Sequence, residues 1–287
     1  MLKLDNISKS YGKTQVLADI RLDFADENGI YGLLGRNGVG KTTLMMMIAN
    51  QISDYSGNIL FNQEDVKGND EALDHILLFG TPIADDNILF VGKLADTIQL
   101  YQEAIETFDG SLMSELMHTF DLDPKTKYEK LSSGNKTLFT NSLALASRTA
   151  ITLLDEPTNG LDSINRQLFF RKMMEDYSAH PRMFIVSTHL IAEVENYLTH
   201  AVMIENQNVV LNESIENIQE KAFRVTSFDI MTKNILAKEN IAGITVTDIY
   251  DNLSTNERRE IEIAGGKVDS LNLQELFNGL LGGEKHE

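Results

Sequence analysis

The chain has 287 residues, of which 42% are hydrophobic and 24% charged, as expected for a globular protein with a sizeable core. It contains no cysteine, which excludes disulfides and thiolate metal sites within it. Its net charge of −18 opposes binding to phosphate backbones, so we expect no nucleic-acid partner. The start lacks the apolar core of a signal peptide, and no apolar run reaches the roughly 18 residues of a membrane span. We therefore expect a cytoplasmic protein.

The N-terminal part of the sequence predicts a β ribbon, a strand and a helix. Polar and apolar residues alternate over residues 2–7 and again over 16–24, which is typical of two half-buried antiparallel strands. Residues 30–34 are an apolar strand that leads into a glycine-rich loop. Residues 41–52 have the apolar spacing of a helix.

The middle of the chain predicts strands that alternate with helices. We expect strands at residues 57–61, 75–79, 151–154 and 183–187 and a hairpin at 201–211. A helical block is expected at 90–146 and a single helix at 163–177. Parallel strands alternating with helices indicate an α/β domain. The helical subdomain at about residues 90–146 is an insertion into it.

The character of the sequence changes after about Ser214. Short alternating segments at residues 223–228 and 243–249 precede a charged stretch and a final amphipathic helix at 271–281. We therefore predict two domains, an α/β domain at residues 1–212 and a small α+β accessory domain at 213–287.

The segment GRNGVGKTT at residues 35–43 fits the phosphate-binding pattern G-x-x-x-x-G-K-[ST]. Such a loop turns successive backbone N–H groups toward a polyphosphate, and the following helix directs its N-terminus at the anion. Lys41 is predicted to reach the β- and γ-phosphates of ATP, Thr42 to ligate Mg²⁺ and Thr43 to assist at the α-phosphate. The predicted phosphate cradle consists of Gly35, Arg36, Asn37, Gly38, Val39 and Gly40.

Two acidic residues end the apolar strand in the segment ITLLDEPTNGLD. A buried strand of this kind delivers its last residues to the sheet edge where ligands bind. We predict that Asp155 belongs to the magnesium shell and that Glu156 is the base that polarises the attacking water. His189 follows another buried strand, FIVST, and is a candidate γ-phosphate sensor, although a lone histidine also commonly serves as a structural hydrogen-bonding group.

A second anion-binding helix start lies at LSSGN. Ser132, Ser133 and Gly134 leave backbone N–H groups available for a phosphate. One chain rarely needs two such termini for one nucleotide. We therefore predict that this terminus serves a nucleotide held by another chain across a dimer interface.

These motifs together resemble those of the ATP-binding subunits of ABC transporters over roughly residues 1–212. Residues 35–43 match Walker A, 131–135 resemble the family signature usually written LSGGQ, and 151–156 match Walker B. Residues 159–162 resemble the D-loop and His189 the switch histidine. Tyr11 lies where the family places an aromatic ring that stacks on adenine.

The resemblance implies a P-loop ATPase fold with a RecA-like core, an antiparallel β ribbon and a helical insertion. It also implies that two such domains, identical or related, hold ATP and Mg²⁺ head to tail between them. Hydrolysis would power a separate transmembrane permease, with the chain peripheral on the inner face of the membrane. Exporters of peptides, lantibiotics or toxins are most similar, a phenol-soluble-modulin exporter among them, so a peptide or drug-like substrate is expected.

The sequence departs from the family pattern in two places. The signature reads LSSGN, with Ser133 for the second glycine and Asn135 for the glutamine. The glutamine expected after residues 75–79 is missing, and Thr81 is the nearest equivalent. The missing glutamine keeps open the alternative of a nucleotide-gated binding or immunity module with low turnover. A second alternative is a soluble ABC ATPase without a transport role, although such proteins usually carry two nucleotide domains or a long coiled coil, and the net charge of −18 also argues against it.

Overall fold

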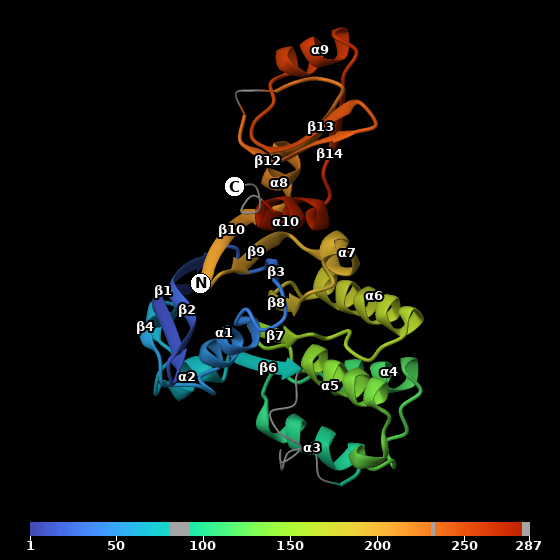
Figure 1. The fold of residues 1–287 in the computed structure, drawn as a ribbon. Helices are drawn as coiled ribbons and strands as arrows, with labels where there is room; N and C mark the ends of the chain where they lie inside the picture. The colour runs from blue at the N-terminus through green and yellow to red at the C-terminus, as the bar shows by residue number, and fades with distance from the viewer. Residues whose placement is uncertain (81–91, 231–232, 283–287) are drawn as a thin grey trace.

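The computed structural model describes residues 1–80, 92–230 and 233–282, so Thr81, the predicted glutamine replacement, lies outside the described residues. Within these ranges the strands form three sheets (Figure 1). The first is antiparallel, with the strand order β2-β1-β4-β5. Its strands are β1 (Leu2–Tyr11), β2 (Thr14–Phe24), β4 (Ser56–Phe61) and β5 (Glu64–Asp65).

The second sheet is the central one, with the order β10-β9-β3-β8-β7-β6. Five of its strands are parallel, and β10 pairs antiparallel with β9 at one edge. The carboxyl ends of parallel strands meet at one edge of a sheet, where α/β proteins bind their ligands. The strands are β3 (Ile30–Leu34), β6 (Ile76–Gly80), β7 (Ile151–Asp155), β8 (Met183–Thr188), β9 (His200–Glu205) and β10 (Asn208–Ser214).

The central sheet is covered on both faces, which explains why its strands are apolar without alternation. Side chains such as Leu33 and Ile185 pack with α1 and the first sheet, whereas Leu34 and Val186 pack with the helical block. The helices of this part of the chain are α1 (Lys41–Ile48), α2 (Asp70–Leu73), α3 (Leu94–Ala104), α4 (Gly110–Thr119), α5 (Ser133–Ser147), α6 (Ser163–Ala179) and α7 (Ile191–Val194), with 3₁₀ turns at Tyr128–Lys130 and Glu195–Tyr197.

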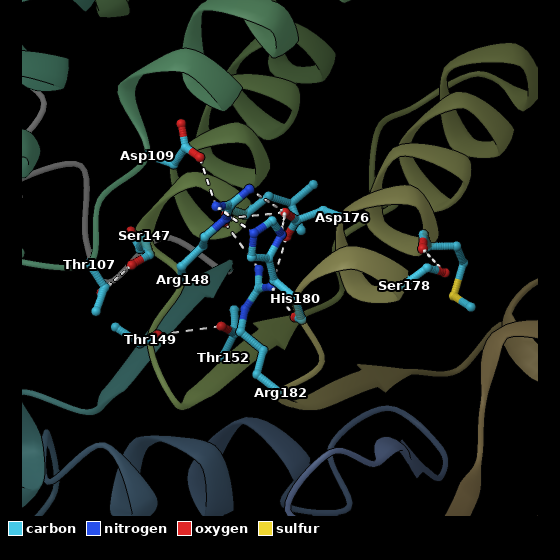
Figure 2. A network of polar contacts seen from close by, with 12 residues as sticks. Thr107, Asp109, Ser147, Arg148, Thr149, Thr152, Asp176, Ser178, His180 and Arg182 are labelled. Carbon is cyan, nitrogen blue, oxygen red and sulfur yellow. Dashed lines mark hydrogen bonds and ion pairs between the residues drawn. The ribbon is translucent and has the colours of Figure 1, made fainter.

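A partly buried polar network ties the helical block to the core (Figure 2). Arg148 ends α5 and pairs with Asp109, the N-cap of α4, at 2.8 Å and with Asp176 of α6 at 3.0 Å. Arg182, just before β8, reaches the other oxygen of Asp176 at 2.8 Å. Because the Asp176 side chain is 2% exposed, its charge requires these two cations. The network therefore joins α4, α5, α6 and the start of β8.

The third sheet lies toward the C-terminus and has the antiparallel order β12-β13-β11-β14. One part of it packs with α9 through Phe223, Ile249 and Ile261. Helix α10 contacts β12 and α7, so it lies between this sheet and the core (Figure 1). The elements are α8 (Ile215–Lys221), β11 (Ala222–Thr226), β12 (Ile235–Ile241), β13 (Ile244–Tyr250), α9 (Thr255–Ile263), β14 (Lys267–Ser270) and α10 (Leu273–Gly282).

The structure differs from the sequence expectations at several element boundaries. The helix predicted over residues 41–52 ends at Ile48, and Asn50 has a left-handed φ of 52°, which a continuing helix does not allow. The predicted division at residue 212 falls inside β10, whose last residue is Ser214, and the two-domain division stays a prediction. Strands β12 and β14 were not expected from the sequence.

Candidate nucleotide-binding site

The glycine-rich loop connects the carboxyl end of β3 to the first residue of α1. Arg36, Asn37 and Gly38 are exposed at its outer bend, Val39 is half-buried, and Gly35 and Gly40 are buried at its two ends. Gly40 has φ 108°, and a Cβ there would lie 2.9 Å from Leu17 Cδ2. This position therefore requires glycine both for its conformation and for its close contact with the β ribbon.

The first residue of α1, Lys41, is held beneath the loop. Its Nζ donates to the carbonyl oxygens of Gly35 at 2.8 Å and of Arg36 at 3.1 Å, and lies 3.9 Å from Glu156 Oε1. Burial lowers the pKa of Lys41, while the carboxylates of Glu156 and Asp155 oppose that shift. An ammonium in this position faces both the glycine-rich loop and the acidic strand end.

Thr42 and Asp155 meet across the base of the loop. Thr42 Oγ1 donates to Asp155 Oδ2 at 2.8 Å, and the Asp155 side chain is buried. Mg²⁺ prefers oxygen ligands and is commonly held by one or two protein groups together with substrate phosphates and water. A hydroxyl and a carboxylate beside a phosphate-binding loop fit this ion. Thr43 is half-buried in the same first turn of α1.

Glu156 and His189 form a pair at the ends of the neighbouring strands β7 and β8. His189 Nδ1 lies 2.9 Å and 3.0 Å from the two carboxylate oxygens of Glu156. Glu156 has a left-handed φ of 49°, which is uncommon for a residue with a side chain. The structure thus brings together Lys41, Asp155, Glu156 and His189 from three different segments.

Ser187 is a buried residue of this cluster that sequence reasoning did not single out. Its hydroxyl donates to Asp155 Oδ1, and it accepts the backbone N–H of Glu156 at 3.1 Å. Both contacts depend on the pairing of β7 with β8, in which Asp155 lies opposite Ser187. The available signal in the sequence was a polar residue within the apolar segment FIVST.

The second predicted anion site lies at the start of α5. Ser132 is the N-cap and accepts the N–H of Asn135 at 3.2 Å, and Ser132 and Ser133 are exposed. A Cβ on Gly134 would lie 2.9 Å from the carbonyl oxygen of Gly160. Glycine here therefore allows the helix start to pack against the loop after β7.

Two side chains of α5 fix this contact. Thr137 donates to the carbonyl oxygen of Asn159 at 3.1 Å, and the buried Asn141 donates to that of Pro157 at 2.7 Å. The loop that follows the acidic pair is therefore bound to α5 at both Pro157 and Asn159.

Tyr11 lies at the end of β1, and the residue is 49% exposed. The ammonium of Lys9 lies 4.8 Å from the ring centroid and also donates to the backbone carbonyl oxygen of Asp54. An exposed ring supported by a cation can offer its open face to a planar base.

A phosphate loop, an acidic strand end and a paired histidine at one sheet edge define a P-loop nucleotide-binding ATPase. Residues 17–159 match the family model described as ABC transporter. The chain is 26% identical to the ABC transporter ATP-binding protein YtrB of Bacillus subtilis, over 99% of each chain. It is 27% identical to the lantibiotic transport ATP-binding protein SrtF of Streptococcus pyogenes, over 77% of this chain and 95% of SrtF.

A solved structure described as the ATP-binding subunit of an ABC transporter has the same fold, with a TM-score of 0.65 and 22% identity. That match covers 76% of this chain and 92% of the solved one. The chain belongs to the ABC transporter family, as an ATP-binding subunit whose ATPase activity drives transport through a separate membrane partner. Among the described residues, no helix is long and apolar enough to cross a bilayer.

Proposed function

We propose that this chain binds ATP with Mg²⁺ in its glycine-rich loop and hydrolyses it with Glu156 as general base. The observation that carries the proposal is the convergence of Lys41, the Thr42–Asp155 pair and the Glu156–His189 pair at one edge of the central sheet. The remaining nucleotide contacts come from the loop residues 35–40, from Thr43 and from Tyr11.

Each side chain has a defined task in the proposed site. Lys41 leaves the loop carbonyls and neutralises the β- and γ-phosphates, while the loop N–H groups bind the other phosphate oxygens. Thr42 and Asp155 hold the magnesium ion, which when bound neutralises charge on the phosphates. Tyr11 stacks on adenine through its exposed face.

Hydrolysis in this site requires one water molecule and one base. Glu156 accepts a proton from water as the water oxygen forms a bond to the γ-phosphorus, and the bond from that phosphorus to the β–γ bridging oxygen breaks to give ADP and phosphate. His189 orients the Glu156 carboxylate and senses the γ-phosphate. Its contact with both carboxylate oxygens supports this role.

We further propose that the site is completed by a second copy of this chain, arranged head to tail. Ser132, Ser133 and Gly134 form an N-terminus of a fifteen-residue helix, which suits a phosphate group. Both serines are exposed in the single chain, as are Arg36, Asn37 and Gly38 of the loop. In a two-fold dimer each copy would supply the loop of one site and the helix start of the other.

The transported substrate is proposed to be a peptide antibiotic or a similar amphiphilic compound that is exported. The match to SrtF, whose name gives lantibiotic transport, supports this class. The permease would hold the chain on the inner face of the membrane. The segment at residues 213–287 is proposed to be an accessory domain, and the full-length match to YtrB supports its being a regular part of such a subunit.

The test uses Glu156→Gln, which removes the base but preserves the size of the side chain. Its ATP hydrolysis is expected to be abolished while fluorescent-ATP binding is retained, and ATP with Mg²⁺ is expected to convert it to a dimer in size-exclusion chromatography with light scattering. Exposed Glu216→Gln, on α8, is the matched control and should behave as wild type. A Glu156→Gln variant that hydrolyses ATP normally contradicts the assignment of the base, and one that stays monomeric contradicts the dimer.

The substrate class needs a separate experiment. The chain is purified with its membrane partner, and ATP hydrolysis in proteoliposomes is measured with a lantibiotic and, as a control, with maltose. Stimulation by the peptide alone supports export of peptides, whereas stimulation by maltose or by neither compound contradicts it.

A further inference from the structure

Ser187 links the two acidic residues of the site through a single hydroxyl. It is the fifth residue of β8 and is fully buried, with 0% exposure. The hydroxyl donates to Asp155 Oδ1 and accepts the N–H of Glu156 at 3.1 Å. The same N–H also lies 3.1 Å from the Ser187 carbonyl oxygen. The hydroxyl and the carbonyl oxygen of Ser187 therefore both accept from the backbone N–H of Glu156.

The contact with Asp155 determines how its carboxylate faces the glycine-rich loop. Ser187 holds Oδ1 from the β8 side, and Thr42 donates to Oδ2 at 2.8 Å from the α1 side. Two hydroxyls on opposite oxygens leave the carboxylate little freedom to rotate. The oxygen that meets Thr42 is thus presented to the position proposed for magnesium.

The contact with Glu156 stabilises an unusual backbone conformation. A φ of 49° is rarely adopted by a residue with a side chain, and it persists only where surrounding contacts determine it. The N–H of Glu156 is held by Ser187, and its carboxylate is held by His189. Without the hydroxyl, the N–H of Glu156 would keep only the Ser187 carbonyl oxygen as an acceptor, so its left-handed backbone would be held less firmly.

Other buried serines in the described part of the chain do not have this arrangement. Ser142 and Ser147, both on α5 and both 0% exposed, donate to the carbonyl oxygens of Leu138 and Leu143 four residues earlier. Such bonds satisfy the hydroxyl within its own helix. Ser187 instead bonds across the sheet to two consecutive residues of the site.

We propose that Ser187 is a positioning residue for ATP hydrolysis, acting through the carboxylate of Asp155 and the backbone of Glu156. The inference rests on the proposed function, because it needs those two residues to act on MgATP. Loss of the hydroxyl lowers kcat and raises the magnesium concentration needed for half-maximal activity. The affinity for ATP itself changes little, since the loop and Lys41 remain in place.

The test compares Ser187→Ala with Ser142→Ala, the same truncation at equal burial outside the site. Ser187→Ala is expected to lower kcat at least about tenfold and to change the KM for ATP by less than about threefold. The dissociation constant of fluorescent ATP is measured over a magnesium series, and its magnesium midpoint is expected to rise several-fold. Ser142→Ala is expected to keep kcat within about twofold of wild type.

A third variant, Ser187→Thr, retains the hydroxyl and is expected to recover most of the lost kcat. Folding of each variant is checked by its thermal midpoint and circular dichroism. Folded Ser187→Ala with unchanged kcat and magnesium midpoint overturns the inference. If Ser187→Ala does not fold, the magnesium midpoint of folded Ser187→Thr is measured instead. A midpoint equal to that of wild type supports the inference, and a shifted midpoint overturns it. Failure of wild type to hydrolyse ATP would instead overturn the proposed function.

Discussion

Replacing Asp176 by asparagine tests the polar network that joins the helical block to the core (Figure 2). The substitution preserves the size of the side chain but removes the charge that Arg148 and Arg182 share. Arg182 is 6% exposed, and burial already lowers the pKa of its guanidinium. After the substitution, the charge of the Arg182 guanidinium would remain buried beside Arg148, with no carboxylate at position 176 to balance it.

Removing one partner of a buried ion pair typically costs about 3–5 kcal/mol. The lower end applies here, about 3 kcal/mol, because Arg182 still donates to the carbonyl oxygens of His180 and Leu145 and Arg148 still pairs with Asp109. For a chain of this size, 1 kcal/mol corresponds to about 2–4 °C in the thermal midpoint. The expected decrease for Asp176→Asn is therefore about 6–12 °C.

The assay is differential scanning calorimetry of wild type and variant at pH 7, with urea unfolding as a second measure of the free-energy change. Asp269→Asn is the control, because its ion pair with Lys267 joins two side chains that are 45% and 73% exposed. Such a surface pair contributes little, so the control midpoint should move by less than about 2 °C. An equally small decrease for Asp176→Asn would refute the reasoning.

Two further predictions concern the proposed adenine contact of Tyr11 and the proposed accessory domain. In steady-state kinetics, Tyr11→Ala is expected to raise the KM for ATP several-fold with kcat nearly unchanged, and Tyr11→Phe is expected to behave as wild type. An equal rise in KM for Tyr11→Phe would mean that the hydroxyl, and not the ring, contacts the nucleotide. Hydrogen bonds from Lys233 and Ser254 lower the pKa of Glu257 to about 2. Its stabilisation is therefore present above the ordinary value of 4.5 and is lost as pH falls toward 2. The difference in thermal midpoint between wild type and Glu257→Gln should shrink from pH 6 to pH 3, and a constant difference contradicts this.

The fold class could be predicted because its signals are local. An apolar strand, a glycine-rich loop and a helix follow one another within residues 30–48, and the strand β7 ends at Asp155, which Glu156 follows directly. The chemical roles of the glycine-rich loop and of the two acidic residues can therefore be predicted from their spacing in the sequence. The comparisons confirm the resulting family assignment.

Ser187 could not be predicted in this way, because its role depends on a contact between strands that are 32 positions apart in sequence. Only the register of β7 with β8 places it opposite Asp155. Strand β12 was missed for a different reason. As an edge strand it is largely exposed and carries Lys238, Glu239 and Asn240, so its sequence lacks the apolar alternation of a half-buried strand.

The central claim is that each nucleotide is bound by the loop of one copy and the α5 start of another. The most direct test mixes two inactive variants, Lys41→Ala and Ser133→Glu. In a mixed dimer, one site has an intact loop and an intact α5 start, whereas the other site has neither. The account predicts that mixing restores about a quarter of wild-type ATP hydrolysis, since half of the dimers are mixed and each has one intact site. Activity that stays at the level of the separate variants, with mixed dimers present, would contradict it.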